Sequence, residues 1–182
     1  MLRAADDLLV ERGFAALTME GIAQRAGVAK QTIYRWWKSK VDILLDTLSE
    51  DAREALAWQP GEDDPEEGLK RHLRRVADFF EEPAGQVMRA LLGHAQLDEE
   101  TAASLRAGFL REQRERDVAG LRALLARGDG PGVDERTADR LVDLLLGPLY
   151  HRVLVCGEPV DEELVNTTAR LVVTLANDAP GL

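Results

Sequence analysis

The chain has one cysteine among its 182 residues, so it cannot form an intramolecular disulfide. Because disulfides are typical of oxidising compartments, we expect this protein in a reducing one, the cytoplasm. Cys156 lies in an apolar run, which favours a packing role over redox sensing or an intermolecular disulfide. Long apolar stretches and a signal-peptide pattern are also lacking, which argues against a membrane-spanning or secreted protein.

The residue patterns that catalysis needs are scarce as well. His72, His94 and His151 are isolated, and none has a second ligand at metal-binding spacing. There is no phosphate-binding glycine loop, no G-x-S-x-G turn and no evident Cys–His pair. We expect His72 to face solvent, and His94 and His151 to lie in the core or to line a pocket. The sequence therefore predicts no catalytic residue, no metal site and no cofactor.

Acidic residues are plentiful overall but missing from one segment. The formal net charge is -10, yet residues 1–40 carry a balance of +3 and residues 41–182 a balance of -13. An acidic body repels a polyanion except where a basic surface is presented. Between positions 25 and 40 there is no acid and there are five bases: Arg25, Lys30, Arg35, Lys38 and Lys40.

The same region, TMEGIAQRAGVAKQTIYRWWKSK from Thr18 to Lys40, has the pattern of two short helices joined by a turn. Thr18 is a suitable N-cap, and the apolar positions that follow it have helical spacing. Gly27 supplies the left-handed residue that ends the first helix. A second helix is predicted from about Ala29 to Trp37, with Ala29, Ile33 and Trp37 inward. Ser39 and Asp42 match a capping box that begins the next helix.

The outward positions of the second helix carry side chains that can bind phosphate oxygens or base edges. A helix-turn-helix that enters the DNA major groove is therefore predicted. The alternative is a structural three-helix unit with a solvated basic face. The outward residues are Lys30, Gln31, Thr32, Tyr34, Arg35 and Trp36.

Over roughly its first 48 residues, the chain resembles the DNA-binding domain of tetracycline-repressor-type (TetR) transcriptional regulators. The resemblance rests on T-x-x-x-I-A-x-x-A-G-V-x-K-x-T-x-Y-x-x-[aromatic]-x-S-K. It implies that Gln31, with Arg35 less certainly, faces bases. Ala29 departs from the family's capping Ser or Thr, at a cost of about 1 kcal/mol. The positions that the resemblance assigns to phosphate are Thr18, Lys30, Thr32, Tyr34, Trp36 and Lys40.

The remainder of the chain has helical periodicity and no strand pattern, so we expect an all-α protein with about nine helices. A DNA-binding domain is predicted at 1–45, and a larger effector-binding and dimerisation domain at 46–182. The helix after Ser39 is predicted over about 40–57. Linkers are predicted at 60–65 (PGEDDP) and 128–132 (GDGPG). The first predicted helix starts at the first residues of the sequence, so whether a basic arm precedes Met1 is left open.

The last two helices, about 134–156 and 161–177, are capped by Asp134 and Asp161 and have unusually broad apolar stripes. Such breadth indicates burial on two sides, against the body and against a partner, and the resemblance implies a homodimer through these helices. The alternative is a buried hairpin in a monomer. Pro148 should kink its helix, shaping either the dimer face or a pocket. The candidate interface residues are Leu141, Leu145, Leu149, Leu164, Leu171, Val172 and Leu175.

We interpret the chain as a homodimeric repressor that a small hydrophobic effector releases from an inverted-repeat operator in double-stranded DNA. One alternative is a regulator without small-molecule control, acting through protein contacts or as an activator. Another is a helical enzyme or adaptor with a DNA-binding-like N-terminus. The candidate effector-pocket residues, large and apolar or amphipathic, are Phe79, Phe80, Met88, Leu91, Leu92, His94, Phe109 and Tyr150.

Overall fold

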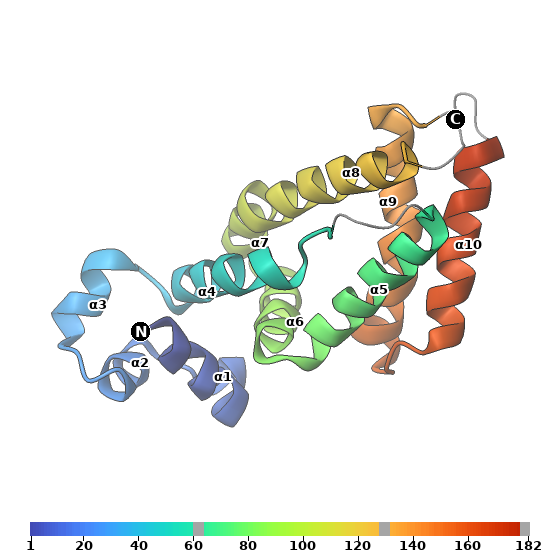
Figure 1. Ribbon diagram of the computed structural model, residues 1–182. Helices are drawn as coiled ribbons and strands as arrows, with labels where there is room; N and C mark the ends of the chain where they lie inside the picture. The colour runs from blue at the N-terminus through green and yellow to red at the C-terminus, as the bar shows by residue number, and fades with distance from the viewer. Residues whose placement is uncertain (60–63, 128–131, 179–182) are drawn as a thin grey trace. The chain divides into compact units, whose positions relative to one another are not determined.

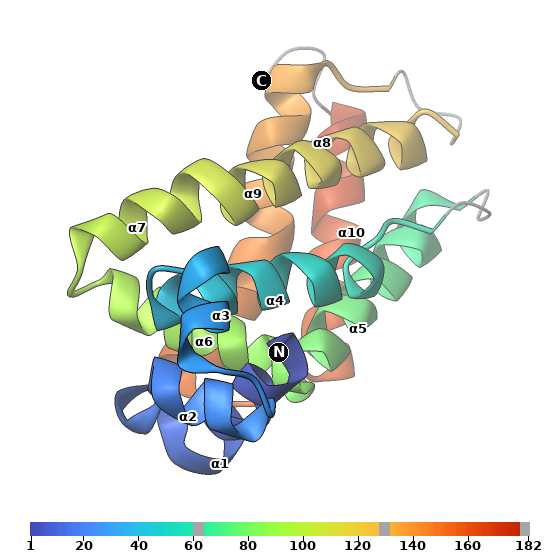
Figure 2. The same cartoon turned by 90° about the vertical axis from the view of Figure 1, so that its left-hand side faces the viewer.

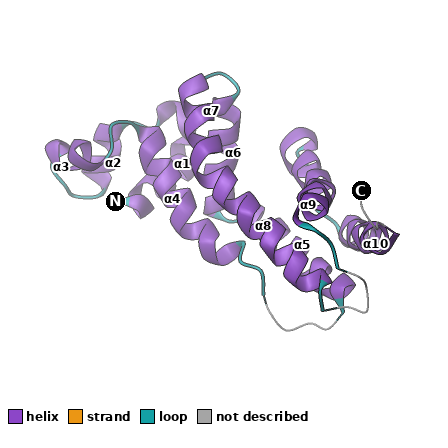
Figure 3. Ribbon diagram, turned by 90° about the horizontal axis from the view of Figure 1, so that it is seen from above, coloured by secondary structure: helices purple, strands orange, loops and turns teal. Residues whose placement is uncertain are grey.

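The computed structural model describes residues 1–59, 64–127 and 132–178. All regular structure in these ranges is helical, as the sequence predicts (Figure 3). None of the described helices is both long and apolar enough to span a membrane. Most of the two predicted linkers, residues 60–63 and 128–131, lies outside the described ranges. The elements are α1 (Leu2–Ala16), α2 (Met19–Arg25), α3 (Lys30–Trp36), α4 (Lys40–Ala55), α5 (Pro65–Glu81), α6 (Pro83–Ala95), α7 (Glu99–Leu105), η1 (Arg106–Leu110), α8 (Arg111–Leu125), α9 (Glu135–Tyr150), η2 (His151–Cys156) and α10 (Glu162–Asp178).

These elements agree with the expected helix count once uninterrupted segments are joined. The π-helical segment η1 connects α7 directly to α8, and η2 continues α9 in the same way. Nine separate helices then remain in the described part of the chain. The two late N-caps are confirmed, because Asp134 accepts a hydrogen bond from the Thr137 amide and Asp161 accepts one from the Leu164 amide.

The chain divides into two compact units, which are described separately. The first contains residues Met1–Ala55 and Phe79–Leu110, and thus α1 to α4, the end of α5, α6, α7 and η1. Helices α1, α4 and α6 each pack against the other two (Figure 1, Figure 2). Their contacts bury Leu8 of α1, Leu44 and Leu48 of α4, and Leu91 of α6. Burying a side chain of this size stabilises the fold by about 1.5–3 kcal/mol, so these contacts fix α4 against α1.

The second unit contains residues Leu56–Asp78 and the described residues from Arg111 onward. Within it, α9 packs against both α8 and α10. The buried side chains include Leu121 of α8, Leu145 of α9 and Val172 of α10. Helix α5 is joined to α10 by an ion pair in which Arg74 contacts Glu162 at 2.8 Å.

Pro148 lies inside α9, and the helix changes to the wider π-helical form three residues later, at η2. Proline has no backbone N–H, so it cannot donate the hydrogen bond of a regular α-helical turn. Segment η2 ends at Gly157, whose φ of 68° is left-handed. The helix type thus changes on the C-terminal side of the proline, and the predicted kink at Pro148 stays a prediction.

Candidate nucleic-acid interface

The predicted helix-turn-helix is present, and local hydrogen bonds define both of its ends. Thr18 Oγ1 accepts a hydrogen bond from the Gly21 amide at 3.1 Å, which caps α2 as expected. At the other end Gly27 has a φ of 68°, a backbone conformation that favours glycine. The Val28 amide donates to the Ala23 carbonyl at 3.0 Å, and the Gly27 amide donates to Gln24. These two bonds form a Schellman motif, which turns the chain sharply from α2 into α3.

Helix α3 is held by fewer contacts than its sequence suggests. Ile33 is fully buried, but Ala29 is exposed, so the prediction that Ala29 points inward is wrong. Ala29 is the N-cap of α3 and, as the sequence predicts, makes no side-chain cap hydrogen bond. Trp37 is half-buried, and its Nε1 donates to Asp46 of α4 at 2.7 Å. The buried Ile33 and the indole hydrogen bond of Trp37 thus help to hold α3 against the rest of the unit.

The predicted capping box is confirmed at the start of α4. The Ser39 amide donates to Asp42 Oδ2 at 3.0 Å, and the Asp42 amide donates to Ser39 Oγ at 3.2 Å. The same Asp42 oxygen accepts from the Lys38 amide at 2.9 Å. The segment between α3 and α4 is therefore fixed by three hydrogen bonds.

The outward face of α3 is fully accessible. The six side chains that the sequence assigns to DNA on this helix, Lys30, Gln31, Thr32, Tyr34, Arg35 and Trp36, are all exposed. Trp36 is 67% exposed, although tryptophan is highly buried on average. The Arg35 guanidinium lies over the Trp36 ring, 5.7 Å from its centroid. The structure thus brings these side chains together on one short helix, in a form suited to the major groove.

An acidic residue of α2, which the sequence argument did not include, sits beside this face. Glu20 Oε1 lies 2.5 Å from Lys30 Nζ and accepts a hydrogen bond of 3.2 Å from the Tyr34 hydroxyl. The hydrogen bond from Lys30 holds the pKa of the Glu20 carboxyl below its ordinary value. Two residues assigned to phosphate therefore have an internal acidic partner in the free protein. The sequence could not predict this contact, because it depends on how α2 and α3 cross as well as on the spacing of residues along each helix.

Lys40, the second basic residue assigned to phosphate, is tied to α1. Its Nζ donates to the Phe14 carbonyl at 2.6 Å and lies 4.2 Å from the centroid of the Phe14 ring. Burial lowers the pKa of this ammonium group. An ammonium group has three donors, so this bond leaves others that can reach a phosphate. The Phe14 ring also contacts α6, because its centroid lies 4.5 Å from the centroid of the His94 ring.

The candidate effector-pocket residues fall in both units. Seven belong to the first unit, whereas Tyr150 belongs to the second. Phe79, Phe80, Met88, Leu91 and Phe109 are each at most 3% exposed and fill the core of the first unit. Leu92, His94 and Tyr150 are half-buried. A pocket formed by these eight residues stays a prediction.

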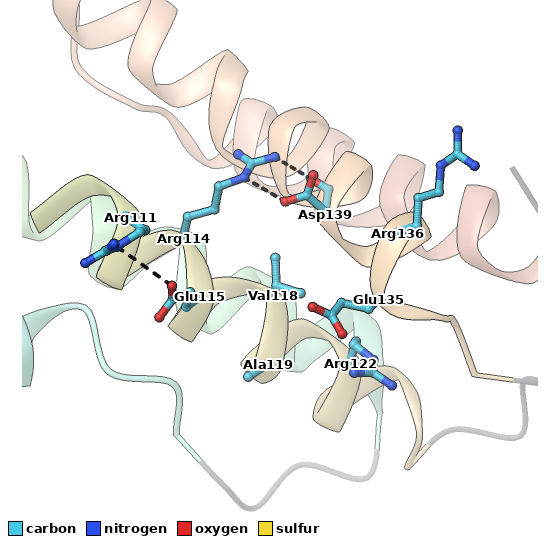
Figure 4. A pocket seen from close by; sticks show the side chains of 9 residues that line it. All are labelled: Arg111, Arg114, Glu115, Val118, Ala119, Arg122, Glu135, Arg136 and Asp139. Atoms are coloured by element: carbon cyan, nitrogen blue, oxygen red, sulfur yellow. Dashed lines mark hydrogen bonds and ion pairs between the residues drawn. The ribbon is translucent and has the colours of Figure 1, made fainter. Parts of the chain in front are cut away.

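The second unit has a groove of about 650 Å³ between α8 and α9 (Figure 4). Arg114 reaches across it, with Nε 2.7 Å from Asp139 Oδ1 and Nη1 2.7 Å from Asp143 Oδ1. Hydrogen bonds to Asp143 and Asp139 raise the pKa of the Arg114 guanidinium above its ordinary value. Seven of its nine lining residues carry a charge, and none of the candidate effector-pocket residues is among them. The lining residues are Arg111, Arg114, Glu115, Val118, Ala119, Arg122, Glu135, Arg136 and Asp139.

A buried polar cluster in the second unit corrects one expectation. His72 is 3% exposed, so the prediction that it faces solvent is wrong. Its ring stacks on Trp58 at 3.8 Å, and Trp58 Nε1 donates to Asp117 at 3.0 Å. Asp117 also accepts a hydrogen bond of 2.9 Å from Gln113. A side chain on Gly120 would overlap the Trp58 ring, so glycine is required for this close approach.

Burial controls the ionisation of this cluster. It lowers the pKa of His72 to about 3, with a smaller contribution from Arg75. It raises the pKa of Asp117 to about 6, although hydrogen bonds from Trp58 and Gln113 act in the opposite direction. The sequence signal for His72 was present, because it shares a helical stripe with Leu69, Leu73 and Val76, which are all buried.

The broad apolar stripes of α9 and α10 divide into an inner and an outer face. Leu141, Leu145, Leu149 and Val172 are at most 1% exposed in the single chain, whereas Leu164 and Leu175 are half-buried. Leu171 is 48% exposed. Four of the seven candidate interface residues are therefore covered by the chain's own packing. The outer apolar residues include Leu144, Leu154, Val155 and Leu171.

The segment after α9 also differs from expectation. Cys156 and His151 are exposed in the single chain, with Sγ 3.6 Å from the imidazole Nδ1. The expectations that Cys156 packs, and that His151 lies in the core or a pocket, are wrong for the single chain. The π-helical form of η2 rotates successive residues differently from an α-helix, so α-helical spacing does not give their faces.

Comparison with known proteins agrees with this architecture. Residues 1–47 match the family model of bacterial regulatory proteins, tetR family, and residues 59–172 match the tetracyclin repressor-like C-terminal domain. The chain is 34% identical over 167 residues to the uncharacterized HTH-type transcriptional regulator YdeS of Bacillus subtilis, covering 91% of this chain and 82% of YdeS. The crystal structure of the TetR family transcription regulator SCO0332 matches with a TM-score of 0.76 at 33% identity, covering 95% of this chain and 94% of SCO0332.

A shorter match joins the chain to the HTH-type transcriptional activator FasR of Mycolicibacterium smegmatis. The two are 33% identical over 88 residues, which is 44% of this chain and 39% of FasR.

Fold and site together define an all-helical, DNA-binding helix-turn-helix regulator. The chain belongs to the tetR family of transcriptional regulators. The boundary between two domains after residue 45 stays a prediction, because the compact units divide the chain elsewhere.

Proposed function

We propose that this regulator is a homodimeric repressor, which a small hydrophobic effector releases from an inverted-repeat operator. The observation that carries the proposal is the exposed face of α3, where six side chains suited to phosphates and bases stand together without an acid on that helix. We assign base readout to Gln31 and Arg35. Thr18, Lys30, Thr32, Tyr34, Trp36 and Lys40 are assigned to the phosphate backbone.

Dimerisation is supported by apolar surface that the single chain leaves uncovered. Leu144 of α9 is 43% exposed, Leu171 of α10 is 48% exposed, and Val155 of η2 is 73% exposed. A second copy that covered these residues would form an isologous interface, and its two copies of α3 would then require mirrored half-sites. We assign the interface to this outer face of α9, η2 and α10.

Release by an effector is supported by a chain of contacts within the first unit. His94 of α6 contacts the Phe14 ring, and Lys40 at the start of α4 contacts the same ring and its carbonyl. Met88 and Leu91 of the candidate pocket lie on α6 as well. An effector that moved α6 would thus disturb a residue assigned to phosphate. A coupling of about 1–3 kcal/mol would weaken the operator complex roughly 5–150-fold.

An activator is the second candidate, because FasR, which resembles part of this chain, is named as one. Both modes of regulation need the same DNA-binding surface. A reporter gene behind a selected operator distinguishes them, since a repressor lowers and an activator raises expression when the protein is supplied.

Fragments selected from genomic DNA by the purified protein test the proposed function directly. We expect an inverted repeat among them, and a mobility shift that it produces should be lost when a hydrophobic effector is added. The effector is found by screening compounds for thermal stabilisation of the protein. Met88→Ala or Phe109→Ala should change the response to it. Compounds that stabilise the protein but leave the DNA complex intact would contradict release by an effector.

A further inference from the structure

Arg35 and Trp36, neighbours at the C-terminal end of α3, form a cation–π contact on the exposed face of that helix. The Arg35 guanidinium lies 5.7 Å from the centroid of the Trp36 ring, and both side chains are exposed. Trp36 is also the most exposed aromatic side chain of the chain. Covering apolar surface is favourable, so the free protein presents a large ring that gains free energy once DNA covers it.

Arg35 is held differently from the other basic side chain of this helix. Lys30 is paired with the carboxylate of Glu20, whereas Arg35 contacts the face of an indole. A cation–π contact restrains the planar guanidinium but uses none of its five N–H donors in a hydrogen bond. Arg35 therefore meets DNA already oriented and with its donors free, which is the form that bidentate hydrogen bonding requires.

A phosphate contact alone does not account for the size of Trp36. An indole has one donor, the Nε1–H group, and a phosphate oxygen would use only that group. The rest of the ring is apolar, and the apolar group that bases present in the major groove is the C5 methyl of thymine. Guanine presents two acceptors there, O6 and N7, which match the guanidinium of an arginine. The two side chains in contact thus match two different bases.

We propose that Arg35 and Trp36 together read one dinucleotide step of each half-site, a guanine next to a thymine. Arg35 donates to guanine O6 and N7, and the Trp36 ring covers the thymine methyl. The contact between the two side chains sets the spacing of the two bases that they recognise. The inference rests on the proposed function, and it adds a base contact to the phosphate contact assigned to Trp36.

Fluorescence anisotropy with an operator selected from random DNA tests the pair. We expect a guanine next to a thymine in each selected half-site. Replacing this thymine by uracil removes only the methyl group, and wild type should then bind about fourfold more weakly for each half-site, the effect of leaving one methyl group uncovered. Replacing the guanine by 7-deazaguanine removes only the N7 acceptor and should weaken binding about tenfold.

Two variants separate the roles of the side chains. Trp36→His keeps an N–H donor but removes the large apolar ring, so at about pH 8, where histidine is neutral, it should bind the thymine and uracil operators equally. Arg35→Lys keeps the charge but not the planar fork, so it should lose the response to 7-deazaguanine. Lys38→Ala changes an exposed neighbour outside the pair and is the control, which should keep both responses.

Equal binding of wild type to the thymine and uracil operators would overturn the inference. A response to uracil that persists in Trp36→His would do the same. So would a loss of affinity in Trp36→His that is equal on the operator and on a scrambled duplex, because Trp36 would then contact phosphate alone. These outcomes all include a selected operator and therefore leave the proposed function standing. A wild type that selects no sequence would contradict the proposed function, and the reading of a base step with it.

Discussion

Glu20 of α2 forms an ion pair with Lys30 of α3, with Oε1 and Nζ 2.5 Å apart. The Tyr34 hydroxyl donates to the same oxygen, and the Lys30 ammonium lies 5.4 Å from the Tyr34 ring centroid. In the free protein a carboxylate thus binds two residues that we propose contact a DNA phosphate. The contact also orders two long side chains before DNA arrives, which lowers the entropy lost on binding.

Neutralising Glu20 should strengthen binding to DNA of any sequence. In Glu20→Gln a phosphate no longer competes with a carboxylate for Lys30, and we expect affinity to rise about two- to fivefold, the value of an exposed ion pair. Fluorescence anisotropy with a selected operator and with a scrambled duplex measures this. Glu11→Gln is the control, because Glu11 pairs with Arg25 rather than with a residue of α3. Unchanged or weaker binding by Glu20→Gln would contradict competition between the Glu20 carboxylate and a phosphate for Lys30.

Lys40→Ala should weaken DNA binding for all sequences and also destabilise the protein. A lost phosphate contact flattens the plot of log K against log salt by about 1 for each protomer. The lost bond to the Phe14 carbonyl should lower the melting temperature as well. Anisotropy at several salt concentrations and thermal melting measure the two effects. Lys38→Ala, which changes an exposed lysine, should leave the melting temperature unchanged. A full salt slope in Lys40→Ala would remove Lys40 from the interface.

Substitutions on the two faces of α9 and α10 should have opposite outcomes. Leu171→Arg, on the outer face, should give a folded monomer, because the charge would enter only the interface with a second copy. Leu145→Arg places a charge in the core of the chain itself and should unfold it. Light scattering reports mass and circular dichroism reports folding. A folded dimer from a protein carrying both Leu144→Arg and Leu171→Arg would contradict the assigned interface.

Asp6→Asn should stabilise the protein increasingly as pH rises. The pKa of Asp6 is raised from 3.8 to about 7 in the folded protein. Its protonated form therefore contributes stability to wild type that is fully present below pH 3.8 and is lost as pH rises through 7. The gain should therefore be small at pH 4 and largest above pH 7. Urea unfolding at several pH values measures it, with the exposed neighbour Asp7→Asn as the control. A gain that is equal at pH 4 and pH 8 would show that burial of charge is not its cause.

The parts of the fold that the sequence predicted are those governed by neighbours in the chain. Thr18, Gly27 and the pair Ser39 and Asp42 each act within four residues, and all three local structures are present. Helical periodicity likewise identified α9 and α10 as helices with two apolar faces. It could not say which face the chain itself covers, because that depends on where α8 lies. Leu145 is consequently buried and Leu144 is exposed.

The features that the sequence did not predict depend on contacts between distant elements. Helical spacing signalled the burial of His72, but not its stacking on Trp58, which lies fourteen positions earlier in the chain. Burial raises the pKa of Asp6, and the charges of Asp51 and Glu50, which α4 brings close to α1, raise it further. Such contacts depend on how separate segments of the chain pack, which spacing along one helix cannot supply.

The central claim is that the exposed face of α3 reads a specific DNA sequence, and one measurement tests it most directly. Anisotropy compares the binding of wild type and Gln31→Ala to a selected operator, to single-base variants of its half-site and to a scrambled duplex. Wild type should prefer the operator over the scrambled duplex by about 10³-fold or more. Gln31→Ala should lose discrimination at one half-site position, by about 1–3 kcal/mol, and keep its affinity for the scrambled duplex. Equal binding of wild type to all duplexes, or an unchanged base preference in Gln31→Ala, would contradict the claim.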